Sequence, residues 1–221
     1  MTTTPGAARP DVSDMIVVHQ ALRDSLGAAP ELVRGVDAAD TARRVMVTNV
    51  YDNILAFLHV HHEGEELLVF PRLRDRCPGQ AEMLDQMEAQ HADVVGLIED
   101  SGSALSAWSG GTAGGQEQSA AALAELAGQL EQHLGEEERL VLPLCADSLS
   151  IEEWGALPGH AMGNFTGDKV WLILGLIRER MSQAQRDQMI AHMPPPAVDM
   201  WTSMGEQAFK NLVAEVGPPL G

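Results

Sequence analysis

Apolar residues recur every three or four positions along four long segments of this chain, which is the spacing of amphipathic α-helices. The segments cover residues 13–26, 41–76, 80–100 and 120–147. No stretch shows the sustained alternation, rich in Val, Ile and aromatic residues, that is typical of β-strands. The pattern therefore predicts an all-α protein.

Turn and loop signals separate these segments. The sequence Cys77-Pro78-Gly79 is expected to end the second helix. Residues 101–119 are rich in Ser and Gly, which predicts a flexible loop before the fourth helix. We expect a flexible N-terminus over residues 1–12 and a helical domain over residues 13–149.

The remainder of the chain is predicted to add shorter helices. Capping-box patterns begin at Ser150 and at Ser182 and indicate two helix starts. The prolines at 194–196 interrupt the chain before a last helix that contains Trp201 and Phe209. We therefore expect residues 150–221 to form a helical extension packed on the first domain.

Histidines and glutamates occupy positions that the apolar pattern reserves for buried residues. The second segment carries His61 and Glu65 on its apolar face, and the fourth carries His133 and Glu137 at the same spacing. Residues four apart lie on one helix face, about 5–6 Å apart at Cβ, so each pair can reach one metal ion from one side. The first and third segments each add one inward histidine, His19 and His91.

Burying these six side chains without partners would cost several kcal/mol for each charge, more than a marginally stable domain tolerates. Metal cations would neutralise them, because carboxylates can bridge two ions while imidazoles fill the flanking positions. A single inward histidine is more often a core residue than a ligand. Four such histidines with two glutamates favour a metal site.

The second and fourth segments also match each other as an internal repeat. His61, Glu65, Glu66 and Pro71 stand at the same offsets as His133, Glu137, Glu138 and Pro143.

Other polar residues near the pattern are harder to place. His62 lies about 100° around the helix from His61 and can face the site or a neighbouring helix, so it stays a candidate ligand.

Several polar residues are expected to lie outside the first ligand set. His160 is the best additional candidate ligand, whereas His59 and His192 are expected to be exposed or to lie behind the ligands. Solvated charges beside the site are expected at Glu63, Glu66, Glu136 and Glu138.

Charge and composition exclude several classes of partner. The net charge of −18 repels phosphate backbones, which excludes nucleic acids and anionic membranes as partners. No apolar run approaches the roughly 20 residues that cross a bilayer, and the N-terminal residues lack the features of a signal peptide. Cys77 and Cys145 have no metal-ligand spacing and are expected to be reduced thiols. We expect a cytoplasmic protein.

Taken together, the arrangement resembles the hemerythrin-like HHE cation-binding family. The resemblance is carried by His19, the segment His61-His62-Glu63-Gly64-Glu65-Glu66 with Phe70-Pro71, then His91, then His133 with Glu137 and Leu142-Pro143. It implies an antiparallel up-down four-helix bundle with a dinuclear iron centre bridged by carboxylates and by an oxo or hydroxo group.

The resemblance also implies roles for individual residues. His19, His61 and Glu65 would serve mainly one iron, His91 and His133 the other, with Glu65 and Glu137 as bridges. The oxygen-carrying members have a further histidine where this chain has Val95, and an aspartate one position beyond the place of Glu137. Either His62 supplies the missing nitrogen or one position stays open.

Six or seven protein ligands leave open positions on two octahedral metal ions. We therefore expect a non-haem di-iron protein that binds and reacts with, or senses, small molecules such as O2, H2O2 or NO. As an enzyme it would be a peroxide- or NO-reactive oxidoreductase resembling catalases or peroxidases.

The alternatives are an iron- or oxygen-responsive sensing or iron-storage module without turnover, and a metal-free helical interaction protein. Zinc or manganese would also suit the ligands. Ferritin-like sites pair Glu with His three residues apart and fit the spacing less well.

Overall fold

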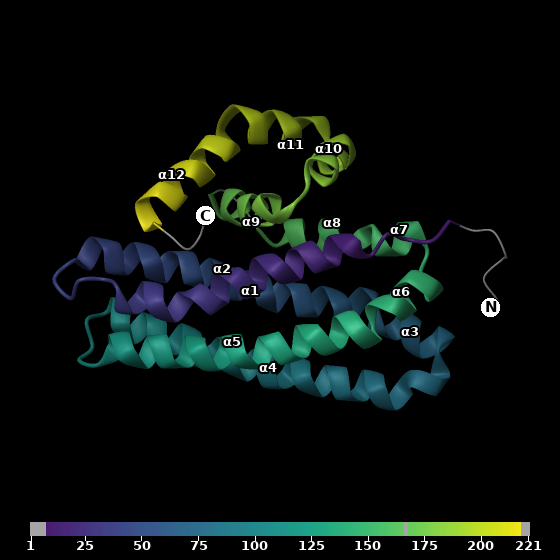
Figure 1. The fold of residues 1–221 in the computed structure, drawn as a ribbon, viewed down its shortest axis with the longest axis horizontal. Coiled ribbons are helices and arrows are strands. Elements are labelled where there is room, and N and C mark those ends of the chain that lie inside the picture. Colours follow the sequence, from purple (N-terminus) through teal and green to yellow (C-terminus); the bar gives the residue numbers. More distant parts are fainter. Residues whose placement is uncertain (1–7, 166–167, 218–221) are drawn as a thin grey trace.

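The computed structural model describes residues 8–165 and 168–217, and within these residues it contains helices and no strand. Four long helices run lengthwise side by side in a helical bundle (Figure 1). They are α1 (Ser13–Arg34), α2 (Thr41–Leu68), α4 (Ala81–Ser109) and α5 (Gly115–Leu140). Helix α5 packs against both α1 and α4, and α2 packs against α4. The prediction of an all-α fold is confirmed.

Two of the predicted helices are each broken near their ends. Helix α2 stops before Val69 and is followed by α3 (Phe70–Arg76), and α5 stops before Val141 and is followed by α6 (Leu142–Ser148). The cause is a proline at the second position of each short helix, Pro71 and Pro143, which has no N–H to continue the hydrogen-bond ladder. The prediction of continuous helices over 41–76 and 120–147 was wrong at these two points.

The predicted flexible loop over residues 101–119 was also wrong. Helix α4 continues to Ser109, and only residues 110–114 separate it from α5. The apolar face continues through Leu105 and Trp108, both buried, and Ser101 is buried beside them. Packing on this face outweighs the weak helix propensity of the Ser and Gly residues. Helix α1 likewise extends beyond the predicted end at residue 26, through the buried Pro30.

Two hydrophobic clusters fill the bundle. The larger contains Leu22, Leu58, Val94 and Leu130, and the smaller contains Met15, Phe70, Met87 and Val141. On each of the four long helices, the predicted inward His and Glu residues fall between the part that contributes to one cluster and the part that leads to the other. A polar layer is therefore enclosed between two apolar ones.

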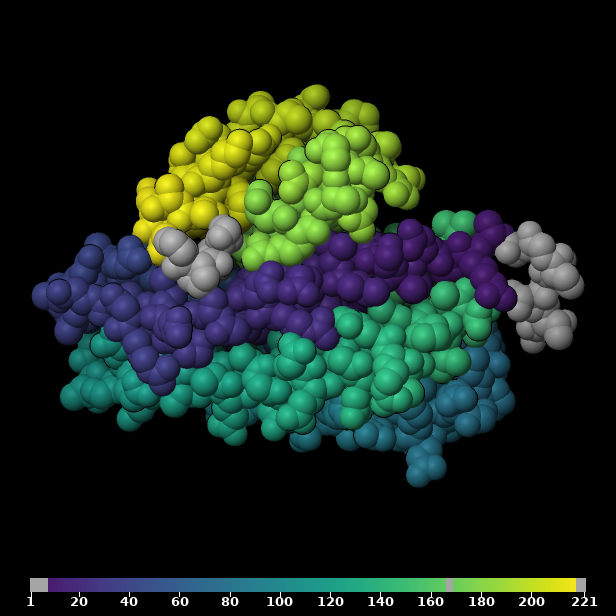
Figure 2. All heavy atoms as spheres, viewed as in Figure 1, coloured from purple at the N-terminus to yellow at the C-terminus, as the bar shows by residue number. Residues whose placement is uncertain are grey.

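The chain after residue 150 forms short helices on one side of the bundle, and the part from residue 168 onward stands as a ridge above it (Figure 2). They comprise α7 (Ile151–Trp154), α8 (Ala156–Gly163), α9 (Asp168–Arg180), α10 (Gln183–His192), α11 (Pro195–Met200), a π-helical turn (Trp201–Gly205) and α12 (Glu206–Val216). A 3₁₀ turn (Pro78–Gln80) also precedes α4. Both predicted capping boxes are present, at Ser150 and at Ser182.

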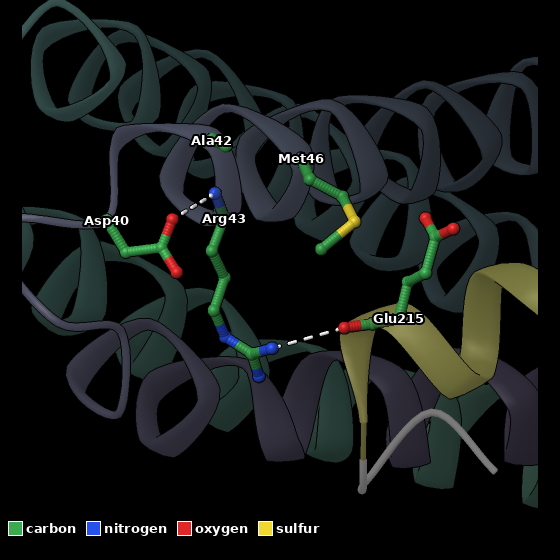
Figure 3. Close-up of a pocket in the computed structure, with 5 residues that line it drawn as sticks. All are labelled: Asp40, Ala42, Arg43, Met46 and Glu215. Carbon is green, nitrogen blue, oxygen red and sulfur yellow. Dashed lines mark hydrogen bonds between the residues drawn. The ribbon is translucent and has the colours of Figure 1, made fainter.

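Specific contacts fix this part on the bundle. The indole Nε1 of Trp154 donates to Oδ1 of Asp14 at 3.1 Å. The guanidinium of Arg43 on α2 donates to the backbone oxygens of Glu215 at 3.1 Å and Val216 at 2.9 Å, so it caps the last turn of α12 (Figure 3). Helix α8 packs on α2, and α9 packs on both α1 and α2.

Parts of two predicted segments cannot be compared with the structure. Residues 1–7 of the N-terminus that we expected to be flexible, and residues 166–167 and 218–221 of the expected extension, lie outside the described residues. Among the helices that are described, none has both the length and the apolar character needed to cross a membrane.

Candidate metal centre

All seven candidate ligand residues lie together in the polar layer, which we define by these residues: His19, His61, His62, Glu65, His91, His133 and Glu137. None of them exposes more than 7% of its surface. They come from all four long helices. The alternation of apolar and polar turns along each helix therefore brings residues that are far apart in sequence into one buried site.

The polar layer divides into two groups of potential ligand atoms. His19, His61, Glu65 and Glu137 form the first group, and His62, His91 and His133 form the second. Within each group, one ligand atom from every residue lies within 4.8 Å of the others. Each group is therefore compact enough to surround one metal ion.

The two carboxylates lie between the groups. One oxygen of Glu65, Oε1, is 3.3 Å from Nε2 of His61, and the other, Oε2, is 3.6 Å from Nε2 of His91. Oε2 of Glu137 is 3.5 Å from Nε2 of His19 and 3.8 Å from Nε2 of His133. Two ligands that each lie about 2.1 Å from a shared ion are about 3.0–4.2 Å apart. All four distances fall in this range.

Many buried ring nitrogens and carboxylate oxygens of the layer lack hydrogen-bond partners within the described part of the chain. They include Nε2 of His19, His61, His91 and His133, both ring nitrogens of His62, both oxygens of Glu65 and Oε2 of Glu137. Buried polar atoms are nearly always paired, so a convergent set of unpaired ones needs a ligand. These donors fit a bound cation.

Burial sets the protonation of the layer. It lowers the pKa of His91 to about 3, and it lowers the pKa values of His61 and His62 well below the ordinary value, with help from the neighbouring imidazoles. These three imidazoles are therefore neutral near pH 7, which is the form that binds metals. Burial, followed by the adjacent Glu137, raises the pKa of Glu65 well above its ordinary value, and a cation beside it would favour its charged form.

Hydrogen bonds behind the layer orient three of its histidines. Nδ1 of His19 donates to Oε1 of Glu138 at 2.9 Å, and Nδ1 of His91 donates to Oε1 of Glu66 at 3.1 Å. Nδ1 of His133 donates to Oε1 of Gln90 at 3.0 Å. Each bond leaves the Nε2 lone pair directed at the centre, as outer partners of metal-bound histidines commonly do.

Sequence reasoning did not assign these orienting roles. We expected Glu66 and Glu138 to be solvated charges. Glu66 is exposed, as expected, and Glu138 is half-buried, and each also accepts a hydrogen bond from a histidine of another helix. The bond from His19, with the adjacent Arg23, lowers the pKa of Glu138 to about 2. The internal repeat could have indicated the orienting roles of Glu66 and Glu138, since each directly follows a glutamate of the polar layer. No sequence signal pointed to Gln90.

The site has an approximate two-fold arrangement that runs through both halves of the bundle. Residues 72 positions apart play the same part: His19 with His91, His61 with His133, Glu65 with Glu137 and Glu66 with Glu138. The helix breaks at Val69 and Val141 obey the same spacing. The internal repeat inferred from the second and fourth helices thus extends to the first and third.

The comparison with known proteins assigns the chain to a family. The family model of the hemerythrin HHE cation-binding domain matches residues 11–145, more than half of the chain. The chain belongs to this family. No curated protein and no solved structure matches it. All seven residues of the polar layer fall within the matched range of this HHE protein.

His62 breaks the two-fold arrangement of the HHE domain. Its counterpart 72 positions later is Leu134, a buried core residue. The His62 ring is stacked on His91 with centroids 4.2 Å apart, and it meets the His133 ring edge-on at 4.9 Å. The sequence left open whether His62 faced the site or a neighbour, and the structure places it in the second group. Val95 is half-buried on α4.

His160, the best additional candidate from the sequence, belongs to neither group of the HHE domain. Its Nε2 lies 3.2 Å from Oε2 of Glu63, and its ring lies over Gly64, where an added Cβ would be 3.1 Å from Cδ2 of His160. Helix α8 is thus held against the turn of α2 that separates His61 from Glu65. His59 and His192 are exposed, as expected.

Proposed function

We propose that this HHE protein holds two iron ions in the polar layer and uses them to bind and react with O2, H2O2 or NO. The proposal includes an antiparallel up-down bundle over residues 13–149 and an extension over residues 150–221 packed on it. The observation that carries it is the position of the two glutamates. Each lies between a histidine of the first group and one of the second, as a carboxylate that bridges two ions would.

The donor set supports a dinuclear site of this kind. Five imidazoles and two carboxylates, without a thiolate, suit iron and neighbouring divalent metals. In this proposal His19 and His61 hold one ion, and His62, His91 and His133 hold the other. Seven residues do not fill the coordination of two octahedral ions, so positions remain for a small molecule.

The chain itself supplies geometry and an apolar surrounding. When bound, the iron ions would supply the electrons for reaction with oxygen or nitrogen species. Glu66, Glu138 and Gln90 fix the histidine rings, and the two hydrophobic clusters exclude bulk water from both sides of the layer.

Metal analysis with a matched pair of variants tests the dinuclear site. Protein produced with ample iron should contain about two iron ions per chain. Glu137→Gln should hold fewer than half as many, whereas Glu125→Gln, an exposed residue on the same helix, should keep them. Equal iron content in Glu137→Gln and in the unaltered protein would exclude a bridging role for Glu137.

Reactivity is tested separately by the optical spectrum and by turnover. Iron-loaded protein should show absorption bands of an oxo-bridged diferric centre that change when peroxide is added, with measurable loss of peroxide. Bound iron without any spectral change or turnover would contradict the reactive function.

A second candidate, an iron- or oxygen-responsive sensing module, is favoured by the contact between α8 and α2. Because His160 lies over Gly64, movement of the ligand-bearing turn would be transmitted to the extension. This function predicts that iron slows amide hydrogen exchange in α8 strongly while peroxide is not consumed. Unchanged exchange in α8 on iron loading would rule the sensing module out.

A further inference from the structure

A small cavity lies inside the extension, away from the polar layer. It has a volume of about 50 Å³ and is bounded by side chains of α9, α10, the π-helical turn and α12. The residues that matter are Arg178, Arg186, Trp201, Glu206, Phe209 and Lys210. A cavity of this size holds a few water molecules or one small polyatomic ion, since a single water needs roughly 10–15 Å³ of such space.

The charge around this cavity differs from that of the whole chain. The protein has 14 Lys and Arg residues against 32 Asp and Glu, yet three basic side chains and two acidic ones, Glu179 and Glu206, line the cavity. Nζ of Lys210 pairs with Oε1 of Glu206 at 2.6 Å. Glu179 is exposed. Glu206 is half-buried like the two arginines, and its bond with Lys210, followed by the charges of Arg178 and Arg186, lowers its pKa. Three basic side chains thus surround this one carboxylate, and the excess of positive charge favours a further anion.

Arg178 has an unpaired donor at this cavity. Its guanidinium carbon lies 5.3 Å from the centroid of the Trp201 ring, and its Nη1 is buried with no hydrogen-bond partner among the described residues. An arginine over an indole keeps its N–H groups available to acceptors in the guanidinium plane. A buried charged donor without an acceptor is costly, so an acceptor in the cavity would stabilise this arrangement.

Arg186 is held beside Arg178 by the backbone. Its Nε donates to the carbonyl oxygen of Arg178 at 2.9 Å, which fixes the second guanidinium next to the end of α9. Arg178 and Arg186 both contribute to the wall of one cavity, where two positive charges favour an anion between or beside them. The pair therefore resembles the arginine clusters that bind phosphate and carboxylate groups.

Close helix contacts give the cavity fixed walls. Gly175 on α9 allows the ring of Phe209 to approach so closely that an added Cβ would lie 2.2 Å from it. Gly205 in the π-helical turn does the same for Trp171 and Trp201, at 2.6 and 2.9 Å. π-Helical turns of this kind often occur at functional sites, because the extra residue shifts the side chains that follow.

We propose that this cavity is a binding site for a small oxyanion, either a phosphate or a carboxylate group. Nη1 of Arg178 donates to the anion, and Arg186 and Lys210 supply further positive charge. The source is a free inorganic anion or the terminal group of a small metabolite. Because α9, α10 and α12 all contribute side chains, a bound anion ties the extension together. This site is independent of the metal centre.

Thermal unfolding and titration calorimetry of the iron-loaded protein test this site, with sodium phosphate and sodium acetate as probes and sodium chloride to keep the ionic strength constant. At a concentration roughly ten times the dissociation constant, the better probe should raise the Tm by about 3 °C. Arg178→Met, which keeps the apolar stem over Trp201, should abolish the rise. Arg180→Met should preserve it, because Arg180 pairs with Asp24 outside the cavity.

The outcomes separate this site from others. A rise with phosphate only indicates a tetrahedral ligand, and a rise with acetate only indicates a carboxylate. A rise that persists in Arg178→Met would locate the anion elsewhere, for example at the metal centre, and would overturn the proposal. The absence of both heat and Tm change in the unaltered protein would overturn it as well.

A second variant tests the site if Arg178→Met fails to fold. Lys210→Met, on the exposed rim of the cavity, should weaken anion binding several-fold. Unchanged binding in that variant would overturn the proposal.

Discussion

The imidazole of His62 is stacked on that of His91, with ring centroids 4.2 Å apart and planes inclined by 10°. The two rings come from different helices, α2 and α4, and both are fully enclosed. In the other half of the repeat, the position equivalent to His62 is the apolar Leu134. The second group of ligand atoms therefore gains a nitrogen donor that the two-fold arrangement alone would not supply.

Replacing His62 by the residue of its counterpart tests whether it binds metal. His62→Leu should weaken iron binding in the second group, so that less iron survives dialysis against a chelator than in the unaltered protein, because that group keeps two imidazoles instead of three. His59→Leu, an exposed histidine on the same helix, should keep the full content. Mass spectrometry measures the iron content of the two variants and of the unaltered protein. If both variants retain two ions, His62 is a packing residue and not a ligand.

The residues behind the ligands should affect metal affinity without being ligands. Glu138→Gln weakens the acceptor for Nδ1 of His19, and we expect about 10- to 100-fold lower affinity for iron. Glu131→Gln is the matched control, since Glu131 also contacts Arg23 but does not touch His19. Competition with a chelator measures the affinities. Equal affinity in both variants would show that the bond from His19 has no part in holding the metal.

Most of the polar layer was predictable from the sequence because six of its seven residues interrupt an apolar pattern. His19, His61, Glu65, His91, His133 and Glu137 stand at positions where a core residue was expected, and helix geometry alone brings such positions together. His62 was not decidable in this way. It lies on the flank of the apolar face, and its direction depends on how closely α2 and α4 approach, which is a property of the folded protein.

The end of α4 and the start of α5 were wrongly predicted for a different reason. Ser101, Gly102 and Ser103 suggested a loop, because local composition carries no information on packing. Ser101 and Leu105 are completely buried, so contacts with the other helices decide the structure there. The outer hydrogen bonds were likewise missed, because which carboxylate reaches which Nδ1 depends on side-chain contacts between helices.

The contact between α8 and α2 predicts different effects for two glycine substitutions. Gly128→Ala, on an exposed part of α5 with nothing near the new Cβ, should stabilise the protein by about 0.5–1 kcal/mol through helix propensity. Gly64→Ala should lose this gain, because its Cβ would lie 3.1 Å from Cδ2 of His160. Urea unfolding measures both effects, and hydrogen exchange should show faster exchange in α8 for Gly64→Ala only. Similar stabilisation by both substitutions would mean that α8 does not depend on the close approach.

The start of the extension should respond to pH through Glu153. Its carboxylate accepts hydrogen bonds from Arg76 at 2.6 and 2.8 Å and from the backbone N–H of Ser150 at 2.9 Å. The bond with Arg76 is the main cause that lowers the pKa of Glu153 to about 2, from an ordinary value of 4.5. A lowered pKa stabilises the fold above pH 4.5, and this stabilisation is lost as the pH falls from 4.5 towards 2.

Glu153→Gln should therefore destabilise the protein by about 1 kcal/mol at pH 7, because these groups are partly exposed and the full pKa shift is screened by solvent. At pH 3 the difference between the variant and the unaltered protein should shrink by half or more. Urea unfolding at the two pH values measures it, with Glu152→Gln, the exposed neighbour, as the control. If the difference in unfolding free energy stays constant between pH 7 and pH 3, the charge of Glu153 does not stabilise the contact between α7 and the end of α3. The stabilisation at this point would then come from the capping box only.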